Sequence, residues 1–197
     1  EDRHRIGSPG VGWLNRYTAP GKYTTRKIDE GEVEIDTGVA LVARVPGLWA
    51  KANGQPVTVG ADCAGLGSGI QGIGDIFSSV TTKVISELDD TAREVSQLFA
   101  GPHSVRSNVL DRHCALDQHV DVYIAGFPCQ PFSNLGKRLG TNDPAGRGTI
   151  CYRIASYIQN ALPTVFVLEN VRAFRTTRNG RDFKEFITRL TRIRDKR

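Results

Sequence analysis

From Val57 onward, short apolar runs alternate with amphipathic segments, and this pattern predicts alternating strands and helices. The strand-like runs are rich in Val, Ile, Phe and Leu and cover residues 56–64, 81–88, 105–110, 120–127 and 163–171, the third being the weakest. The helix-like segments repeat apolar residues at three- and four-residue intervals and cover residues 89–101, 149–162 and 181–193. Nearly continuous apolar strands between helices are typical of a parallel sheet covered on both faces. We therefore predict the α/β fold class, with a doubly wound, mostly parallel sheet.

The first 55 residues follow a different pattern. They are rich in Gly, Pro and charged residues without a sustained period; residues 32–45 predict one or two strands, and the rest predicts loop. We interpret residues 1–55 as a linker or the edge of an upstream region, and residues 56–197 as the main domain.

Length and cysteine usage narrow the class of protein. A chain of 197 residues without a methionine is expected to be a fragment or a processed piece. No apolar run approaches the roughly 20 residues of a membrane span, and the polar start does not resemble a signal peptide. The four cysteines form no C-x-x-C pair, which argues against a disulfide framework and against zinc, so we expect no metal and a reducing, intracellular setting.

Positive charge gathers at the C-terminal end. The chain has 26 basic and 21 acidic residues, a net charge of +5, and residues 172–197 hold ten of the basic and three of the acidic ones, a net of +7. This segment either attracts phosphate or forms a solvated helix face.

A glycine-dense segment follows the first predicted strand. Gly65, Gly67 and Gly69 lie within it, and residues 67–72 match the pattern G-x-G-x-x-G. Without side chains the backbone can approach a ligand, and a following helix offers amide donors. Glu87 ends the second strand, 22 residues after Gly65, where an acid can bind ribose hydroxyls. The pair indicates an adenosine-containing cofactor and leaves both a nicotinamide dinucleotide and S-adenosylmethionine open.

Two reactive residue types lie at the ends of later strands. Cys129 follows the fourth strand between Pro128 and Gln130-Pro131, which stiffens the backbone into an exposed turn, and Glu169 ends the fifth strand. The carboxyl ends of parallel strands share one edge of a sheet, so Cys129 and Glu169 are expected to face each other. Hydride transfer needs neither residue, whereas addition of a thiolate to an electron-poor ring needs both.

At these residues the sequence resembles the cytosine-5 methyltransferases, which use S-adenosylmethionine. The resemblance runs from about Val57 to Leu190, with motifs in the family's order: AGLGSG, SELDDTAREV, AGFPCQPFS, NDPAGRGTI and VFVLENV. It departs from the family at Cys63, where an aromatic residue is usual, and at Asn108, where an acid normally contacts adenine.

The resemblance implies a role for each site residue. Cys129 is the nucleophile, and Glu169 binds ring nitrogen 3 of a cytosine flipped out of DNA. The cofactor S-adenosylmethionine lies on residues of the glycine segment, of the second strand and after the third strand: Gly65, Gly67, Glu87 and Asn108. Gln130, Ser133 and Arg147 contact nucleic acid, and residues 130–148 form a loop that closes over the base.

Other functions stay open at this point. A transfer-RNA methyltransferase of the same family would use the same chemistry on RNA, an inactive remnant would only bind nucleic acid, and the glycine segment with Glu87 alone is compatible with a nicotinamide-dependent oxidoreductase. The family continues past its glutamate motif with a second base-holding motif, a target-recognition region and a segment that completes the cofactor pocket. The chain ends 28 residues after Glu169, so we expect a catalytic domain that is incomplete at its C-terminal end, with little activity alone. The expected compartment is the nucleus in a eukaryote and otherwise the cytoplasm.

Overall fold

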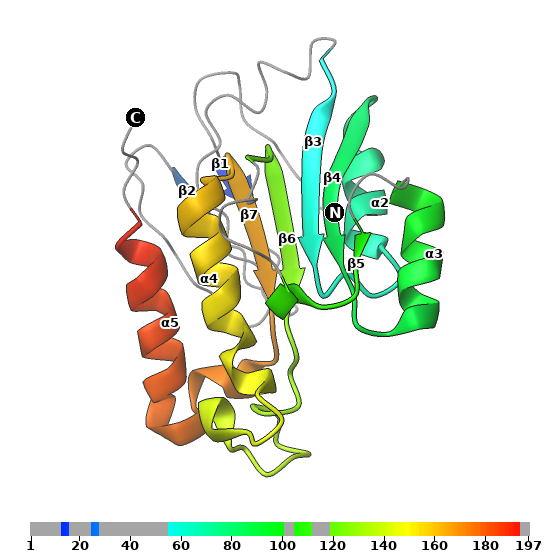
Figure 1. Cartoon of the computed structure of the whole chain (residues 1–197). Coiled ribbons are helices and arrows are strands. Elements are labelled where there is room, and N and C mark those ends of the chain that lie inside the picture. Colours follow the sequence, from blue (N-terminus) through cyan, green and yellow to red (C-terminus); the bar gives the residue numbers. More distant parts are fainter. Residues whose placement is uncertain (1–12, 16–24, 28–54, 101–104, 112–118, 194–197) are drawn as a thin grey trace, which may run out of the picture.

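Five parallel strands form one sheet at the centre of the molecule (Figure 1). This computed structural model describes residues 13–15, 25–27, 55–100, 105–111 and 119–193. The sheet has the order β5–β4–β3–β6–β7, with bounds Val57–Asp62 for β3, Val80–Ser86 for β4, Val105–Arg106 for β5, Val122–Gly126 for β6 and Val165–Glu169 for β7. The strand order changes direction between β3 and β6, which makes this pair the topological switch point. The predicted α/β class with a parallel sheet is confirmed.

Helices cover both faces of the sheet, as expected of a doubly wound fold. They are α2 (Ser68–Gly74), α3 (Asp90–Ala100), α4 (Ile150–Ala161) and α5 (Arg181–Thr191). Side chains of β6 alternate between the faces because successive residues of a strand point in opposite directions. Tyr123 and Ala125 pack in a cluster with α4 and α5, whereas Val122 and Ile124 pack in a second cluster with α2.

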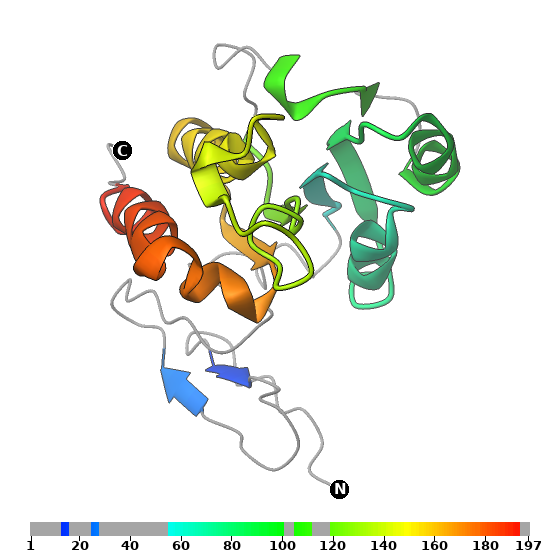
Figure 2. The same ribbon diagram turned by 90° about the horizontal axis from the view of Figure 1, so that it is seen from below.

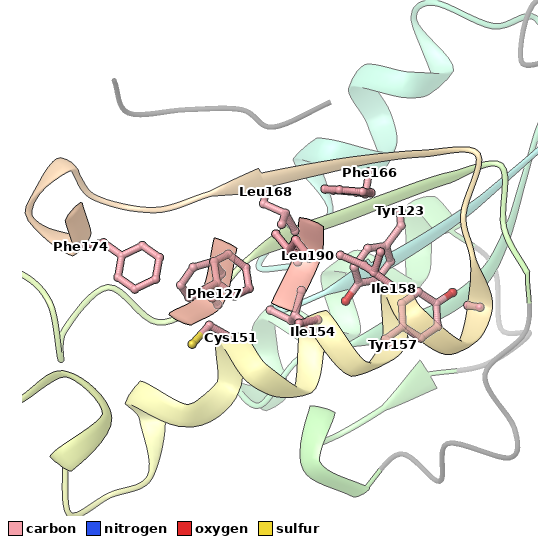
Figure 3. Close-up of a cluster of buried hydrophobic side chains, with 14 of the residues drawn as sticks. Tyr123, Phe127, Cys151, Ile154, Tyr157, Ile158, Phe166, Leu168, Phe174 and Leu190 are labelled. Carbon is pink, nitrogen blue, oxygen red and sulfur yellow. The ribbon is translucent and has the colours of Figure 1, made fainter. Parts of the chain in front are cut away.

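The larger core cluster lies between the β6–β7 pair and the helices α4 and α5 (Figure 3). At one end of it the ring of Phe127 lies edge-on to that of Phe174, with 5.4 Å between centroids, and 5.6 Å from that of Phe186. Burial of each such side chain stabilises the fold by about 1.5–3 kcal/mol, and aromatic pairing adds about 0.5–1.5 kcal/mol. Phe127 and Phe174 follow the ends of β6 and β7 (Figure 3), so this packing fixes the chain just beyond both strands.

The apolar residues that recur through the helix predicted over residues 181–193 share one face of α5. Phe186 and Leu190 are buried, and Phe183, Ile187 and Ile193 pack against the same cluster while partly exposed.

Three segments differ from the sequence-based expectation. The weak third strand is only the two residues of β5, followed by the 3-10 turn η1 (Val109–Asp111), because residues 107–111 hydrogen-bond locally instead of pairing with β4. The glycine-dense segment itself becomes helical from Ser68.

In the N-terminal region, where loop was predicted outside residues 32–45, β1 (Trp13–Asn15) pairs antiparallel with β2 (Thr25–Lys27). Strands of three residues are too short to show an alternating pattern. The strands predicted within residues 32–45 lie outside the described residues, and the interpretation of residues 1–55 as a linker or edge stays a prediction.

Candidate active site

Glu169 lies directly across the carboxyl end of β6. In the β6–β7 register it is paired with Gly126, and a Cβ built on Gly126 would lie 3.6 Å from the Glu169 Oε2 atom. Cys129 follows Gly126 by three residues and is half-buried. The structure therefore brings the two predicted catalytic residues to the ends of neighbouring strands.

Asn170 connects the two chain segments that carry these residues. Its Nδ2 donates a hydrogen bond of 2.8 Å to the carbonyl of Phe127, and its Oδ1 accepts one of 2.8 Å from the amide of Val171. One amide side chain thus joins the turn after β7 to the backbone two residues before Cys129. The sequence marked this asparagine only as part of the glutamate motif; its role as a connection between strands needed the structure.

The backbone turns sharply at Cys129. The Cys129 carbonyl accepts hydrogen bonds from the amides of Phe132 at 2.9 Å and Ser133 at 2.8 Å. This turn leaves Gln130 exposed and Ser133 half-buried on the stretch that follows the thiol, and the Ser133 hydroxyl accepts a bond of 3.2 Å from the Leu135 amide. Both predicted base-contact residues therefore lie within one turn of Cys129.

The environment of Glu169 raises the pKa of its carboxyl group. The residue is exposed at the edge of the sheet, yet partial burial of its carboxyl raises the pKa of Glu169 above its ordinary value. A carboxyl group with this shift retains a proton more readily, which suits a group that donates a hydrogen bond to a ring nitrogen.

Asp182 anchors the far part of the loop after Cys129. This buried carboxylate accepts hydrogen bonds of 3.0 Å from both the amide and the hydroxyl of Thr141, and pairs with Arg178 at 2.8 Å. A Cβ on Gly140 would lie 1.9 Å from Asp182 Oδ2, so the loop backbone passes directly over this carboxylate. Residues 139–148 are therefore held against α5, whereas residues 134–138 are exposed.

Arg147 is engaged within the same loop. Its Nε and one terminal nitrogen donate to the two carboxylate oxygens of Asp143, at 2.9 Å and 2.8 Å. This bidentate pair lowers the pKa of Asp143 and raises that of Arg147. The predicted contact of Arg147 with nucleic acid would thus come from a guanidinium whose orientation Asp143 already fixes.

The glycine segment is fastened to the end of β4 by Glu87. Its Oε2 accepts a hydrogen bond of 2.7 Å from the Gly65 amide, and its Oε1 accepts one of 3.0 Å from the Asp89 amide. Gly65 has a φ of 54° and no atom within 4 Å of where a Cβ would be. The structure therefore leaves open space beside the residue expected to approach the cofactor.

Asn108 reaches the same edge of the sheet through β5. The Glu87 amide donates to the Arg106 carbonyl at 3.1 Å, and Asn108 follows two residues later. Its Oδ1 accepts a bond of 2.9 Å from the Leu110 amide, which begins the turn η1. The four predicted cofactor residues thus come from one edge, at the ends of β3, β4 and β5.

A buried carboxylate lies at the switch point, at a residue that was not among the predicted site residues. Asp62 is fully buried at the end of β3, accepts a hydrogen bond of 2.7 Å from the Ser86 hydroxyl and also accepts one from the Tyr123 hydroxyl. It therefore joins β3 to both neighbouring strands, directly before the glycine segment. The available signal was a polar residue at the end of each of two apolar strands.

The sequence matches the family model described as C-5 cytosine-specific DNA methylase over residues 61–193. The chain belongs to this family. The resemblance inferred from the motifs is thereby confirmed. The match does not favour the nicotinamide-dependent alternative, because the matched residues 61–193 include the glycine segment and Glu87 on which that alternative rested.

Relatives in this DNA methylase family include bacterial enzymes. The chain is 37% identical over 131 residues to the Type II methyltransferase M.NgoBI of Neisseria gonorrhoeae. The aligned region covers 65% of this chain and 40% of that protein. It is 36% identical over 129 residues to the Type II methyltransferase M.BsuFI of Bacillus subtilis, covering 64% of this chain and 30% of that protein. The chain thus spans less than half the length of these relatives.

A solved structure agrees on the fold. The methyltransferase EhMeth of Entamoeba histolytica aligns with a TM-score of 0.50 and 20% identity over 69% of this chain and 43% of that one. At this identity the likeness supports the fold alone.

The described residues contain neither a membrane-spanning helix nor a cluster of metal ligands. No helix among them has the length and apolar character needed to cross a membrane. Within the same residues, no three side chains of His, Cys, Asp or Glu gather into a group that could hold a metal ion.

Proposed function

We propose that the protein containing this chain transfers a methyl group from S-adenosylmethionine to carbon 5 of cytosine in DNA. The observation that carries this proposal is the placement of Cys129 and Glu169 at the ends of two adjacent parallel strands, joined by the hydrogen bond from Asn170 to Phe127. The proposal extends to an intracellular setting, because the substrate is DNA, with the nucleus or the cytoplasm depending on the cell.

In this mechanism Cys129 acts as the nucleophile. Carbon 5 of cytosine is too poor a nucleophile to accept a methyl group directly. Addition of the Cys129 thiolate to carbon 6 moves electron density onto carbon 5 and makes it reactive. After methylation, loss of the carbon 5 proton and departure of the Cys129 sulfur restore the aromatic ring.

Glu169 assists the same step by binding ring nitrogen 3. Attack at carbon 6 builds negative charge on the ring, and a proton shared between Glu169 and nitrogen 3 relieves it. The raised pKa of Glu169 supports this role, since the group retains its proton more readily than an ordinary glutamate.

The residues at the ends of β3, β4 and β5 are proposed to bind S-adenosylmethionine. The open space beside Gly65 admits a ligand close to the backbone, and the Glu87 carboxylate lies next to it, where it can accept bonds from ribose hydroxyls. Gly67 and Asn108 complete this proposed contact set. When bound, S-adenosylmethionine supplies an electrophilic methyl group on its sulfonium.

Gln130, Ser133 and Arg147 are proposed to contact the DNA around the flipped base. The first two lie within one turn of Cys129, and Arg147 is held by Asp143 at the end of the same loop. RNA as the substrate is the second possibility within the family, and the description of the matching model as a DNA methylase favours DNA.

Trapping on a fluorinated base tests the proposal. The full-length natural protein is incubated with S-adenosylmethionine and a long mixed-sequence duplex in which 5-fluorocytosine replaces cytosine. Fluorine cannot leave as a proton does, so the Cys129 adduct should persist and survive denaturation.

Two variants make this test specific. Cys129→Ser should trap no DNA, whereas Cys151→Ser should trap as much as the parent, because a serine at this buried position can still donate to the Gly148 carbonyl as Cys151 does. Equal trapping by Cys129→Ser and the parent would show that another group is the nucleophile.

A further inference from the structure

Two segments of the chain carry basic residues and no acidic ones. Residues 130–142 contain Lys137 and Arg138, and residues 170–180 contain Arg172, Arg175 and Arg178, with no Asp or Glu in either stretch. The first segment follows Cys129 and the second follows Glu169, so both begin at the proposed active site.

The fold brings these two segments together. Arg138 donates a hydrogen bond of 3.0 Å to the Thr176 hydroxyl, and the Thr177 hydroxyl donates one of 3.0 Å to the Phe132 carbonyl. Thr176 directly follows the turn η5 (Arg172–Arg175), which comes after β7. Seen from the carboxyl edge of the sheet, the loop after β6 and the segment after β7 lie side by side (Figure 2).

Four of these five basic side chains are available to a partner. Arg178 is engaged by the buried carboxylate of Asp182. Lys137, Arg138, Arg172 and Arg175 are exposed, and among the described residues no carboxylate forms an ion pair with them. We call these four residues the basic edge.

One basic residue of α5, Arg189, differs from this arrangement because a carboxylate and a ring engage it. Arg189 pairs with Glu185 at 2.8 Å and lies over the ring of Tyr152, 4.3 Å from its centroid. Arg189 is thus compensated, whereas Arg181, Lys184 and Arg192 are exposed and form no ion pair within the described residues. The basic edge differs from these three residues by its place beside Cys129 and Glu169. The excess positive charge of the C-terminal segment therefore lies partly along α5 and partly on the segment next to Glu169.

We propose that the basic edge binds the phosphate backbone of duplex DNA and holds the duplex in register over Cys129 and Glu169. This inference rests on the proposed function, and it identifies the surface that positions the substrate. Uncompensated arginines suit this task because a guanidinium binds phosphate through two parallel hydrogen bonds. Contacts to phosphate fix orientation without reading sequence, so they serve any recognition sequence.

The salt dependence of DNA binding tests this surface. The full-length natural protein is titrated with a fluorescent mixed-sequence duplex at several salt concentrations. Each lost phosphate contact makes the slope of log K against log salt shallower by about 0.9, so the double variant Arg172→Gln/Arg175→Gln should lose about 1.8 from the slope and bind roughly 10- to 60-fold more weakly near 0.1 M salt. The charge-retaining variant Arg172→Lys/Arg175→Lys should keep most of the slope.

Arg192→Gln is the matched control. It removes one positive charge from an exposed residue directly after the C-terminal end of α5, whereas Arg172 and Arg175 come before the N-terminal end of this helix. The helix has 11 residues and is thus about 16 Å long. Its slope should equal that of the parent. An unchanged slope in the double variant, or an equal loss in Arg192→Gln, would overturn the proposal, as would a loss seen with transfer RNA and absent with duplex DNA.

The outcome separates this inference from the proposed function. Cys129→Ser, which removes the nucleophile, should leave the slope unchanged because it removes no charge contact. Covalent trapping by the parent together with an unchanged slope in the arginine variant would refute the basic edge alone. A changed slope without trapping would support the basic edge and refute the methyl-transfer chemistry.

Discussion

The two halves of the sheet hold their functional segments in different ways. We call the half formed by β6, β7, α4 and α5 the cysteine half. There, side chains from later in the chain hold the segment that follows β6: Asn170 bonds to Phe127, Thr177 to Phe132, and Asp182 to Thr141. We call the half formed by β3, β4, β5, α2 and α3 the glycine half. There, the Glu87 carboxylate holds the glycine segment by accepting a hydrogen bond from the Gly65 amide.

The surfaces of the two halves differ as well. In the part of the chain that the structure describes, seven large hydrophobic side chains are exposed, and five of them lie in the glycine half or in the turn after β5: Leu66, Ile76, Leu88, Leu98 and Leu110. The cysteine half instead buries five phenylalanines in the large core cluster: Phe127, Phe132, Phe166, Phe174 and Phe186. The chain's own hydrogen bonds therefore hold the side expected to perform the covalent step in place, whereas the side expected to bind the cofactor has open space beside Gly65.

The largest expected effect is a loss of stability when one glycine in each half is replaced by alanine, in two separate variants. Gly140→Ala should destabilise the protein by about 3–5 kcal/mol, because the new Cβ would overlap Asp182 Oδ2 and the φ of 56° disfavours a side chain. Gly65→Ala has a similar φ of 54° but open space around it, so only the backbone cost of about 1–2 kcal/mol remains. Urea unfolding measures both; equal losses would mean that the loop is not held against Asp182.

The second effect concerns the glycine half. Glu87→Ala should weaken binding of S-adenosylmethionine by about 1.5–3 kcal/mol in calorimetry, the usual range for a hydrogen bond to a charged group. Glu87→Gln is the matched control, since its side-chain oxygen can still accept from the Gly65 amide, and it should lose less. Binding of a nicotinamide dinucleotide in place of S-adenosylmethionine would contradict the cofactor assignment.

A smaller effect is expected where the two strands of the cysteine half are joined. Asn170→Ala removes the bonds to Phe127 and Val171, and should lower stability by about 1–2 kcal/mol. Because the bond to Phe127 positions Cys129 relative to Glu169, kcat should fall by up to about 100-fold while KM for S-adenosylmethionine stays the same. A rise in KM with an unchanged kcat would assign Asn170 to cofactor binding instead.

The smallest effect is a pH dependence at Glu169. Its folded-state pKa is raised by partial burial, so its charged form costs stability above that pKa and the cost disappears below the ordinary glutamate pKa of about 4.3. Glu169→Gln should therefore be slightly more stable than the parent at neutral pH and equal to it in acid. The gain stays well below about 1 kcal/mol because the side chain is exposed and solvent screens it. Urea unfolding across this pH range measures the difference; a Glu169→Gln variant that is less stable than the parent at neutral pH would mean that the pKa shift has the opposite sign.

Much of the fold and the order of the motifs could be predicted from the sequence. Apolar runs bounded by turn residues placed β3, β4, β6, β7, α3, α4 and α5, because strands buried on both faces leave a strong local pattern. Short elements were placed poorly: the β1–β2 pair was missed and β5 was overestimated, because two or three residues carry no period. The family assignment also followed from local order, since the motifs around Gly65, Glu87, Cys129 and Glu169 lie in sequence where the family has them.

What the sequence determined by itself was the list of reactive groups and the strands that carry them; the tertiary structure decided which of those groups are already engaged. Arg147 and Arg178 look alike as free basic residues in the sequence, yet Asp143 and Asp182 bind them, whereas Arg172 and Arg175 lie exposed. The raised pKa of Glu169 likewise comes from atoms packed around its carboxyl, which no local pattern encodes. The physical reason is that hydrogen bonds and desolvation depend on distances between residues such as Thr141 and Asp182, 41 positions apart in the chain, which only the folded packing sets.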